Sequence, residues 1–290
     1  MVHHQNIQKQ LRNLFLDKFE SKAPAKINVG LNIISKRNDG FHNLETIFYQ
    51  IHDLFDDLTF EKSDRLELIL SVDNQDLVRN NIIIKAVKFL EEKTYTKLTP
   101  KITLKKNIPI GAGLGGGSSD AASTLKAINE LYTLNLTLDE LKSIALKLGS
   151  DVPLFLYNYP TIGKSRGELL EKIDFKIDYP ILLVNPQIHI STREAFSMIV
   201  PKQNSFNYAN LQNEKITDWN KIVKNDFEKS VFNLYPEIRE IKNRLIKIGA
   251  LFSLMSGSGS TVYGIFESIE KAKSVIKLFP NSYFFFIGNK

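Results

Sequence analysis

The sequence of 290 residues contains no cysteine, and no apolar run in it reaches the length of a membrane span. The absence of cysteine excludes disulfide bonds and thiolate metal sites and favours a reducing compartment, so we expect a cytoplasmic protein. A membrane-spanning helix needs roughly 18 or more apolar residues in succession, so none is expected. Internal repeats and low-complexity linkers are also missing. The composition, 43% hydrophobic and 24% charged, is that of a globular protein.

The first twenty residues lack the continuous apolar core of a signal peptide, and we treat residues 1–20 as an N-terminal extension outside the fold. The length of the remaining chain favours two packed domains. The net charge of +6 is spread along the chain and is not gathered into a basic tract. Local positive charge of this kind is sufficient for a small phosphorylated ligand. We therefore expect no nucleic-acid partner and no membrane.

Alternating residues predict a strand over residues 23–36, because apolar side chains from Ile27 to Ile33 alternate with polar ones. Lys26 and Asn28 share the polar face of that strand. The pair Asp39-Gly40 predicts a turn into a second apolar strand over residues 43–51. Phe41 and His42 stand just past this turn.

The rest of the chain predicts a mixed α/β pattern with α+β character, in which strands and helices alternate. Strands are expected over 64–72 and 101–106, and helices over 80–93, from the first alanines after residue 119 to Tyr132, and from a capping box at 137–140 to Gly149. Further on we expect strands at 180–191, 250–256, 261–266 and 282–288, and helices from Pro236 and over 268–279. This second half predicts a two-layer α+β domain.

The stretch "IPIGAGLGGGSSDAAS", residues 108–123, places five glycines within residues 111–117. Gly111, Gly113 and Gly116 satisfy the dinucleotide pattern GxGxxG, which is weak evidence alone. The preceding strand carries lysines on alternate positions, whereas the first strand of a dinucleotide fold is buried on both faces. No Gly-Lys-Ser/Thr closes a P-loop either.

A glycine run that opens a helix is suited to phosphate, because glycine lets backbone amides approach an anion and a helix N-terminus adds aligned N–H groups. Ser118 or Ser119 is the expected N-cap of that helix. The alternative is a flexible surface turn, but packing alone does not explain an entropically costly run of glycines at the start of a helix. The loop is therefore predicted to bind a triphosphate.

The motif "PIGAGLGGGSSDAA" resembles the phosphate loop of the GHMP kinase superfamily, which includes galactokinase, homoserine kinase and mevalonate kinase. "PAKINVGLNI" and "LMSGSGSTVYGIF" resemble that family's N-terminal and C-terminal motifs and stand in the expected order. The resemblance implies a two-domain GHMP kinase fold, with a ribosomal-protein-S5-like ATP domain over residues 21–163. A ferredoxin-like α+β domain over 164–290 would complete the substrate site.

Within the superfamily, "DGFHNLETIF", "GSDVPLFL" and "SGSGSTVYG" resemble the kinases of the non-mevalonate isoprenoid pathway that act on a cytidine diphosphate substrate. The resemblance implies ATP as phosphoryl donor and transfer to the 2-hydroxyl of 4-(cytidine 5′-diphospho)-2-C-methyl-D-erythritol. Mg²⁺ is expected with ATP, with Ser118 or Ser119 as its possible contact. We expect a monomer or a homodimer.

Two residues are implied as catalytic. Asp151 would accept the proton of the substrate hydroxyl, although by itself an aspartate before Pro153 is more typical of a helix N-cap. Lys26 would stabilise the charge that develops on the transferred group, although most strand lysines are solvated.

The same resemblance implies three groups of binding residues. Phe41 would stack on the cytosine and His42 would bond its edge, although the turn context also allows a core phenylalanine and an incidental histidine. The substrate would further contact Asn28 and the turn residues Gly257, Ser258 and Gly259, which glycine content alone describes as a tight hairpin. For ATP the set is Asn81, itself a plausible helix N-cap, with Pro109, Ile110, Gly111, Ala112, Gly113, Leu114, Gly115, Gly116, Gly117, Ser118 and Ser119.

Two alternatives stay open. Another kinase of the superfamily, acting on homoserine, mevalonate or a sugar, would have no use for a cytosine pocket at residues 40–42. A basic nucleic-acid-binding protein would bind RNA with a steep salt dependence and would consume no ATP.

Overall fold

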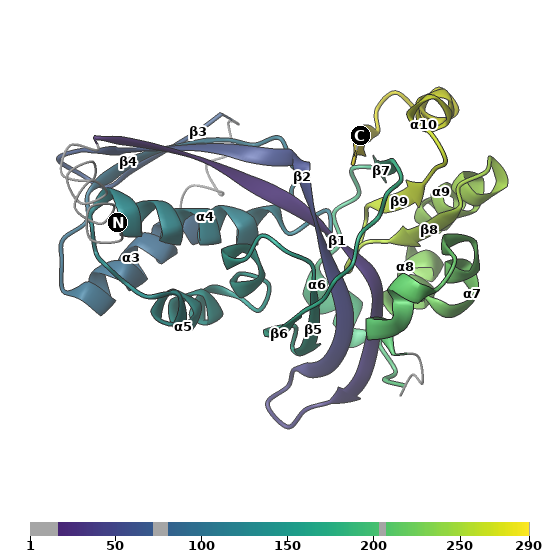
Figure 1. The fold of residues 1–290 in the computed structure, drawn as a ribbon, viewed down its shortest axis with the longest axis horizontal. Helices are drawn as coiled ribbons and strands as arrows, with labels where there is room; N and C mark the ends of the chain where they lie inside the picture. Colours follow the sequence, from purple (N-terminus) through teal and green to yellow (C-terminus); the bar gives the residue numbers. More distant parts are fainter. Residues whose placement is uncertain (1–16, 72–80, 203–206, 290) are drawn as a thin grey trace, which may run out of the picture. The chain divides into compact units, whose positions relative to one another are not determined.

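A computed structural model describes residues 17–71, 81–202 and 207–289. Their contacts divide the chain into two compact units. Unit 1 comprises the described residues up to Ala23, Phe55–Asn107 and Gly116–Tyr157; unit 2 comprises Pro24–Leu54, Ile108–Gly115 and the chain from Asn158 onward. Figure 1 shows the ribbon coloured along the sequence. The units interleave along the chain, and the expected domain boundary near residue 163 stays a prediction.

Two long strands run through both units. They are β1 (Lys18–Lys36) and β2 (His42–Lys62), which pair with each other across the expected turn, where Gly40 has a φ of +84°. Because β1 begins at Lys18, residues 18–20 of the expected extension belong to a strand. Residues 1–16 lie outside the described residues.

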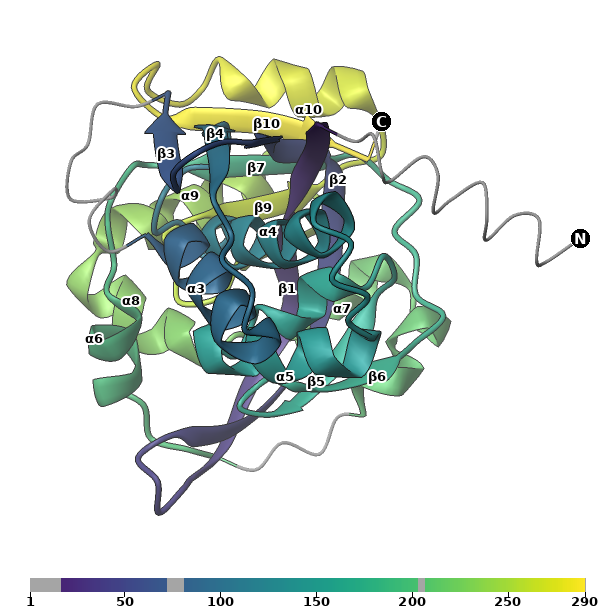
Figure 2. The same ribbon diagram turned by 90° about the vertical axis from the view of Figure 1, so that its left-hand side faces the viewer.

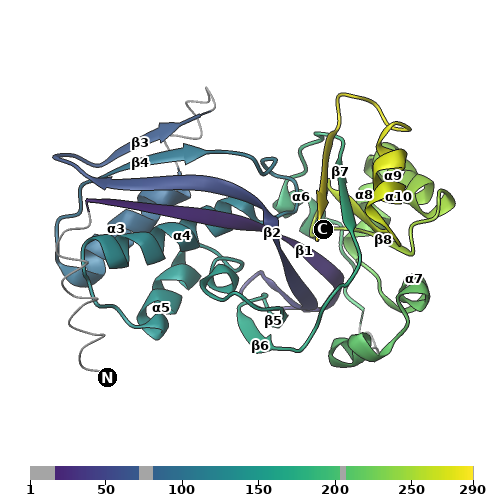
Figure 3. The same ribbon diagram turned by 45° about the horizontal axis from the view of Figure 1, so that its top comes forward.

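Unit 1 is a sheet covered by helices. β4 (Pro100–Lys105) pairs in parallel with β3 (Glu67–Leu70) and antiparallel with the end of β2. Buried and exposed positions alternate along β4, as its lysine pattern predicts. The helices α3 (Ile82–Thr94), α4 (Gly116–Leu131) and α5 (Leu138–Leu148), with the short helix η1 (Pro153–Leu156), pack together on one side of β3 and β4 (Figures 1 and 3).

The capping signals of α5 are confirmed, and that of α4 is not. Thr137 and Glu140 form both bonds of the predicted capping box, and Gly149 caps the end of α5. The prediction of a serine N-cap for α4 is wrong. That helix begins at Gly116, so Ser118 and Ser119 lie inside its first turn, because glycine itself tolerates the helix start.

Unit 2 extends the first half of β2 with two strands that the sequence analysis did not predict. β5 (Thr161–Ser165) pairs antiparallel with β2, and β6 (Leu169–Lys172) pairs antiparallel with β5. β6 is largely exposed and shows no apolar alternation, so its sequence carries no strand signal.

The second sheet of unit 2 confirms the predicted two-layer α+β arrangement. Its order is β10-β7-β9-β8, all antiparallel, with β7 (Ile181–Asn185), β8 (Phe252–Met255), β9 (Val262–Ile265) and β10 (Phe284–Gly288). α9 (Pro236–Lys247), which begins at proline as predicted, packs on β8 and β9, and α10 (Ile269–Ile276) packs on β10 (Figure 2). Both sheets share a buried core in which Tyr263 and Phe252 have no exposed surface.

Several short helices of unit 2 were not predicted from the sequence. They are α6 (Thr192–Ser197), η2 (Tyr208–Asn213), η3 (Ile216–Asp218), α7 (Trp219–Ile222) and α8 (Phe227–Leu234). Apart from α8, each has six residues or fewer, which is too short for helical periodicity to be recognised. In the part of the chain that the structure describes, no helix has the length and apolar character to cross a bilayer.

Candidate active site

Lys26 is buried, which contradicts the alternative of a solvated strand lysine. Its side chain lies on β1 and only 3% of the residue is exposed. The ammonium donates hydrogen bonds to Asn28 Oδ1 at 2.6 Å and to the carbonyl oxygen of Gly113 at 3.2 Å. A buried cation needs such polar neighbours, since an ammonium without them would be costly to desolvate. β1 thereby holds a fixed positive charge beside the glycine loop.

Asn28 is equally buried, at 2% exposure, and connects β1 to other parts of unit 2. Its side-chain amide donates to Thr46 Oγ1 at 3.0 Å, and its backbone N–H donates to Ser256 Oγ at 3.3 Å. The hydroxyl of Tyr263 donates to its carbonyl oxygen at 3.1 Å. The predicted common face of Lys26 and Asn28 thus points into polar surroundings and not to solvent.

The glycine loop needs its glycines for conformation. Gly111, Gly113 and Gly115 have φ values of +65°, +76° and +72°, a region that side chains disfavour. The backbone N–H of Lys26 donates to Leu114 O at 2.9 Å and so fixes the end of this segment to β1. The conformation of the loop therefore requires glycine at these three positions, and the loop is bonded to β1.

The turn formed by residues 256–260 packs directly on Gly113. Ser256 Oγ donates to Gly113 O at 2.9 Å, and the N–H of Thr261 donates to Ala112 O at 3.2 Å. A Cβ atom at Gly113 would stand 2.1 Å from the carbonyl oxygen of Ser256. The segment does connect the antiparallel strands β8 and β9, as the hairpin alternative states. Its contact with the glycine loop is an additional property.

Two glycines give this turn its shape, and a short helix borders it. Gly257 and Gly259 have φ values of +56° and +93°. Ser258 Oγ lies 3.4 Å from Thr192 Oγ1 at the start of α6. Thr192 was not among the predicted site residues, because α6 itself gives no recognisable sequence signal.

The start of α4 offers an open, polar surface in unit 1. The first N–H groups of any helix lack partners within it, and the partial positive charge of that end attracts anions. A Cβ atom at Gly117 would meet no atom within 4 Å. Ser119 Oγ is fully buried and has no hydrogen-bond partner among the described residues. These features fit a phosphate group.

Asp151 lies in unit 1, in the turn before η1, and is half-buried. The alternative role as a helix N-cap is wrong, because Val152 occupies the N-cap position and no side chain caps η1. Asn81, by contrast, is the N-cap of α3, where its Oδ1 accepts from Ile83 N–H at 2.9 Å. Contact of Asn81 with adenine stays a prediction.

Phe41 and His42 follow the β1–β2 turn in unit 2, and both have aromatic or cationic neighbours. Phe41 is 49% exposed, so it is not a core residue, and the Arg166 guanidinium lies 4.7 Å from its ring centroid. The ring of His42 stacks on Phe196 at 5.1 Å. Burial lowers the pKa of His42 below its usual 6.5, and the nearby positive charge of Lys36 lowers it further. The imidazole is therefore neutral at pH 7.

Arg166, Phe196 and His189 are neighbours of the predicted residues that the sequence analysis missed. Arg166 follows β5 and Phe196 belongs to α6, two elements that were not predicted. A Cβ atom at Gly111 would lie 2.3 Å from His189 Nδ1, so that imidazole packs against the glycine loop. None of the three stands in a recognised motif, and only the fold reveals their positions.

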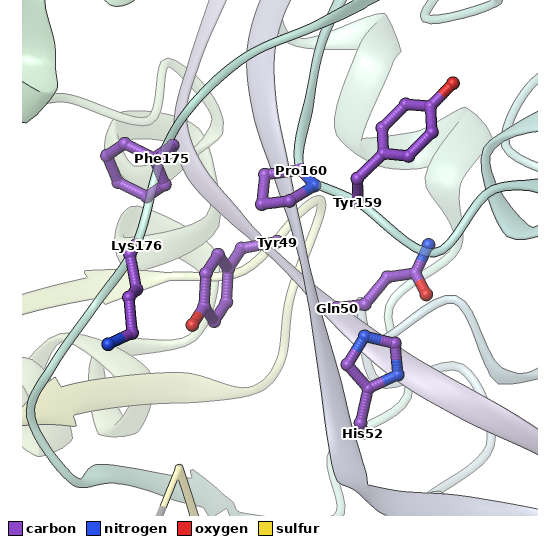
Figure 4. Close-up of a pocket in the computed structure, with 7 residues that line it drawn as sticks. All are labelled: Tyr49, Gln50, His52, Tyr159, Pro160, Phe175 and Lys176. Carbon is purple, nitrogen blue, oxygen red and sulfur yellow. The ribbon is translucent and has the colours of Figure 1, made fainter.

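A separate cavity of about 200 Å³ lies beside β2 (Figure 4). Figure 4 shows its lining from β2 and from the segments around β5 and β6, including Tyr49, His52, Tyr159, Phe175 and Lys176. The predicted site residues do not line it. Among the residues that the structure describes, no group of three or more His, Asp or Glu side chains is arranged to hold a metal ion.

Comparisons with known proteins identify two family regions. The model of the GHMP kinases N terminal domain matches residues 81–159, and the model of the GHMP kinases C terminal domain matches residues 208–283. The first contains α4 and Asp151, and the second contains the turn at 256–260.

Curated relatives cover most of the chain. The 4-diphosphocytidyl-2-C-methyl-D-erythritol kinase of Thermodesulfovibrio yellowstonii is 41% identical over 271 residues, which is 89% of this chain and 93% of that protein. The protein of the same name from Azobacteroides pseudotrichonymphae is 44% identical over 253 residues, covering 84% and 91%.

Solved structures show the same fold. A crystal structure of 4-(cytidine 5′-diphospho)-2C-methyl-D-erythritol kinase superposes with a TM-score of 0.80 at 29% identity, covering 93% of this chain and 98% of that one. Homoserine kinase from Cytophaga hutchinsonii superposes with a TM-score of 0.71 at 18% identity, covering 94% and 95%. At that identity the second likeness concerns the fold alone.

Proposed function

Since the chain belongs to the GHMP kinases and, within them, to the 4-diphosphocytidyl-2-C-methyl-D-erythritol kinase family, we propose that it phosphorylates 4-(cytidine 5′-diphospho)-2-C-methyl-D-erythritol with ATP. The γ-phosphoryl group passes to the 2-hydroxyl, which gives ADP and the 2-phosphate. This reaction belongs to the non-mevalonate route to isoprenoids, and we expect it in the cytoplasm.

One observation carries the proposal. Lys26 Nζ bonds both Asn28 and Gly113, and Ser256 bonds the same two residues. Three motifs that are far apart in the sequence therefore meet within unit 2. In-line phosphoryl transfer asks a protein mainly for positioning and charge neutralisation, and a buried ammonium beside a phosphate loop is suited to both.

The proposed roles follow from that chemistry. Asp151 accepts the proton of the substrate hydroxyl as the oxygen attacks the γ-phosphorus, and Lys26 stabilises the charge on the transferred oxygens. The segment from Pro109 to Ser119 binds the triphosphate through backbone N–H groups, with Asn81 near the adenine. Asn28 and the residues Gly257 to Gly259 contact the acceptor.

The cytosine ring of the acceptor substrate is proposed to bind at Phe41 and His42. A neutral imidazole presents one donor and one acceptor to the cytosine edge, and the exposed ring of Phe41 offers a stacking surface. Phe196, which supports His42 from one side, and Arg166, which lies over Phe41, join this proposed pocket.

Mg²⁺ is proposed to arrive with ATP. In kinase sites this ion is usually held by one or two protein oxygens together with substrate phosphates. Ser118 and Ser119 in the first turn of α4 are the candidate contacts. When bound, the ion neutralises phosphate charge.

A coupled assay of ADP release tests the proposed function. We expect turnover with the cytidine diphosphate substrate and only background rates with mevalonate or homoserine. Equal or faster turnover of mevalonate or homoserine would assign the chain to another GHMP activity. A lack of ATP consumption together with salt-dependent RNA binding would support the nucleic-acid alternative.

A further inference from the structure

Unit 1 contains a buried ionic cluster that the proposed reaction does not use. Lys106 follows the end of β4, and its ammonium lies between the carboxylates of Asp56 on β2 and Asp120 on α4. The Lys106–Asp120 distance is 2.8 Å. Both carboxylate side chains are at most 4% exposed, and the lysine side chain is 10% exposed. Such burial separates this cluster from ordinary surface ion pairs.

The cluster joins the two ends of the glycine segment. Lys106 and Asp120 are 14 positions apart, and every glycine from Gly111 to Gly117 lies between them. The next residue, Asn107, is fixed as well. Its N–H donates to Asp56 Oδ1 at 2.6 Å, and its side-chain amide donates to Phe55 O at 2.8 Å. The residues that precede and follow the glycines 111–117 are thus held together by the same ionic cluster in unit 1.

Stability alone gives a poor reason for this arrangement. A buried ion pair must overcome a desolvation cost that often equals or exceeds its Coulombic gain. Here two buried carboxylates share one ammonium, so a second negative charge in the cluster would have no cation of its own. Asp120 Oδ1 has no hydrogen-bond partner among the described residues. Apolar side chains of similar volume would fill this space without the desolvation cost, but they would not fix the positions of the three chain segments through directional bonds.

We propose that Lys106 and Asp120, anchored by Asp56, are positioning residues that hold the glycine segment in the conformation that binds the ATP triphosphate. The inference rests on the proposed function of that segment. Glycines lose more conformational entropy on ordering than other residues, so a run of them needs external constraint to keep its amides aligned. Joining both ends of the segment supplies this constraint before ATP arrives, and small displacements of such groups are expensive in binding and rate.

The first test is Asp120→Ala in the full-length protein. This variant leaves the Lys106–Asp56 pair intact, so no charge is stranded and the protein is expected to fold. In calorimetric titrations with ATP and no acceptor, we expect the Kd for ATP to rise about tenfold or more, the order of magnitude that a misplaced binding group costs. The KM of the cytidine substrate is expected to stay within about twofold, since the substitution acts on the ATP segment.

Rescue and a matched control separate positioning from simple destabilisation. Asp120→Asn keeps an oxygen that accepts from Lys106, and we expect it to restore most of the ATP affinity. The control is Lys242→Met, which removes a largely buried lysine that pairs with Glu228 at 2.6 Å in unit 2. It is expected to lower the thermal unfolding midpoint and leave the Kd for ATP unchanged.

Three outcomes would overturn the inference. They are an unchanged Kd for ATP in Asp120→Ala, a loss of ATP affinity in Asp120→Asn as large as in Asp120→Ala, and an equal loss in Lys242→Met. If the wild-type protein binds ATP but does not phosphorylate the cytidine substrate, the proposed acceptor is wrong, and the ATP titrations still test the positioning role of Lys106 and Asp120. A wild-type protein that binds no ATP overturns both.

Discussion

The ammonium of Lys26 lies 3.2 Å from the carbonyl oxygen of Gly113, although 87 positions of sequence separate the two residues. This bond ties β1 to the glycine loop at the residue on which the turn at 256–260 also packs. A single lysine therefore supplies both a structural contact and a fixed positive charge beside the segment that is proposed to bind ATP.

Replacing Lys26 by Met removes that charge and leaves Asn28 Oδ1 without the donor at 2.6 Å. We expect kcat to fall about 10²–10³-fold, because fixed charges at the transferred group act mainly in the transition state. Each buried acceptor that loses its partner costs about 1–3 kcal/mol of the free energy of unfolding. Steady-state kinetics and chemical denaturation measure the two effects. Lys22→Met, at an exposed position of the same strand, is the matched control, and a similar loss of kcat there would contradict the assignment.

Asp151→Asn is expected to lower kcat about 10²–10⁴-fold, which is the usual contribution of a general base. The Kd for ATP should stay close to that of the wild type, because the amide keeps the size of the side chain and the proton acceptor acts on the other substrate. Single-turnover ADP release measures the rate of transfer, and titration with ATP measures the Kd. Near-normal turnover in this variant would exclude Asp151 as the base.

Gly117→Ala is expected to weaken ATP binding, whereas Gly113→Ala is expected to destabilise the fold. At Gly117 a Cβ atom meets nothing within 4 Å, so the fold should tolerate alanine, which also favours helix by up to about 1 kcal/mol. The methyl group would fill the space proposed for phosphate and raise the KM for ATP. Gly113→Ala would instead place Cβ 2.1 Å from Ser256 O and lower the unfolding midpoint. An unchanged KM for ATP in Gly117→Ala would show that the phosphates do not bind at the start of α4.

The pH dependence of substrate binding should follow His42. Burial and the charge of Lys36 lower its pKa below 6.5, so the imidazole is neutral from pH 7 upward and becomes charged only in more acidic solution. If the neutral ring binds the cytosine edge, the KM of the cytidine substrate should be constant between pH 7 and 8 and should rise only in more acidic solution. His42→Asn should remove this acidic rise. A KM that falls on acidification would show that the protonated ring is the binding form.

The ionic cluster predicts a pH-dependent stability. Burial raises the pKa of Asp120 to about 7, since the Lys106 charge only partly offsets that burial and Asp56 adds to it. Between its unfolded pKa of about 4 and its folded pKa, the folded state holds an extra proton. The free energy of unfolding should therefore fall as pH rises through this window, by an amount on the order of 1–4 kcal/mol, and should level off above it.

Urea denaturation at pH 5 and pH 8 measures this slope. Asp120→Asn does not titrate, so the difference between wild type and variant isolates the contribution of this one group. Parallel curves for the two proteins would show that Asp120 is ionised in both states and would contradict the raised pKa.

Much of the fold was predictable from local patterns. The strand of β1, the capping box at Thr137, the proline start of α9 and the lysine stripe of β4 were predicted from short-range features, and each is confirmed. The polar face expected for β1 is not exposed, because residues 25–33 are buried on both faces. β6 and α6 were not predicted, because a four-residue exposed strand and a six-residue helix contain too few residues for a period to be visible. The missed residue Phe196 lies on one of these elements.

The sequence by itself determined the order of the three motifs and the glycine loop, and the resemblance of these motifs to known ones indicated the kinase family, because motifs depend on residue types at short spacings. It also placed Lys26 and Asn28 on one face of a strand. Only the tertiary structure decided that this face is buried, that Lys26 reaches Gly113, that the turn at 256–260 packs on the same glycine, and that Lys106 joins both ends of the loop. Contacts of this kind depend on how distant strands and helices pack, and no local pattern records which residues that packing brings within hydrogen-bonding distance.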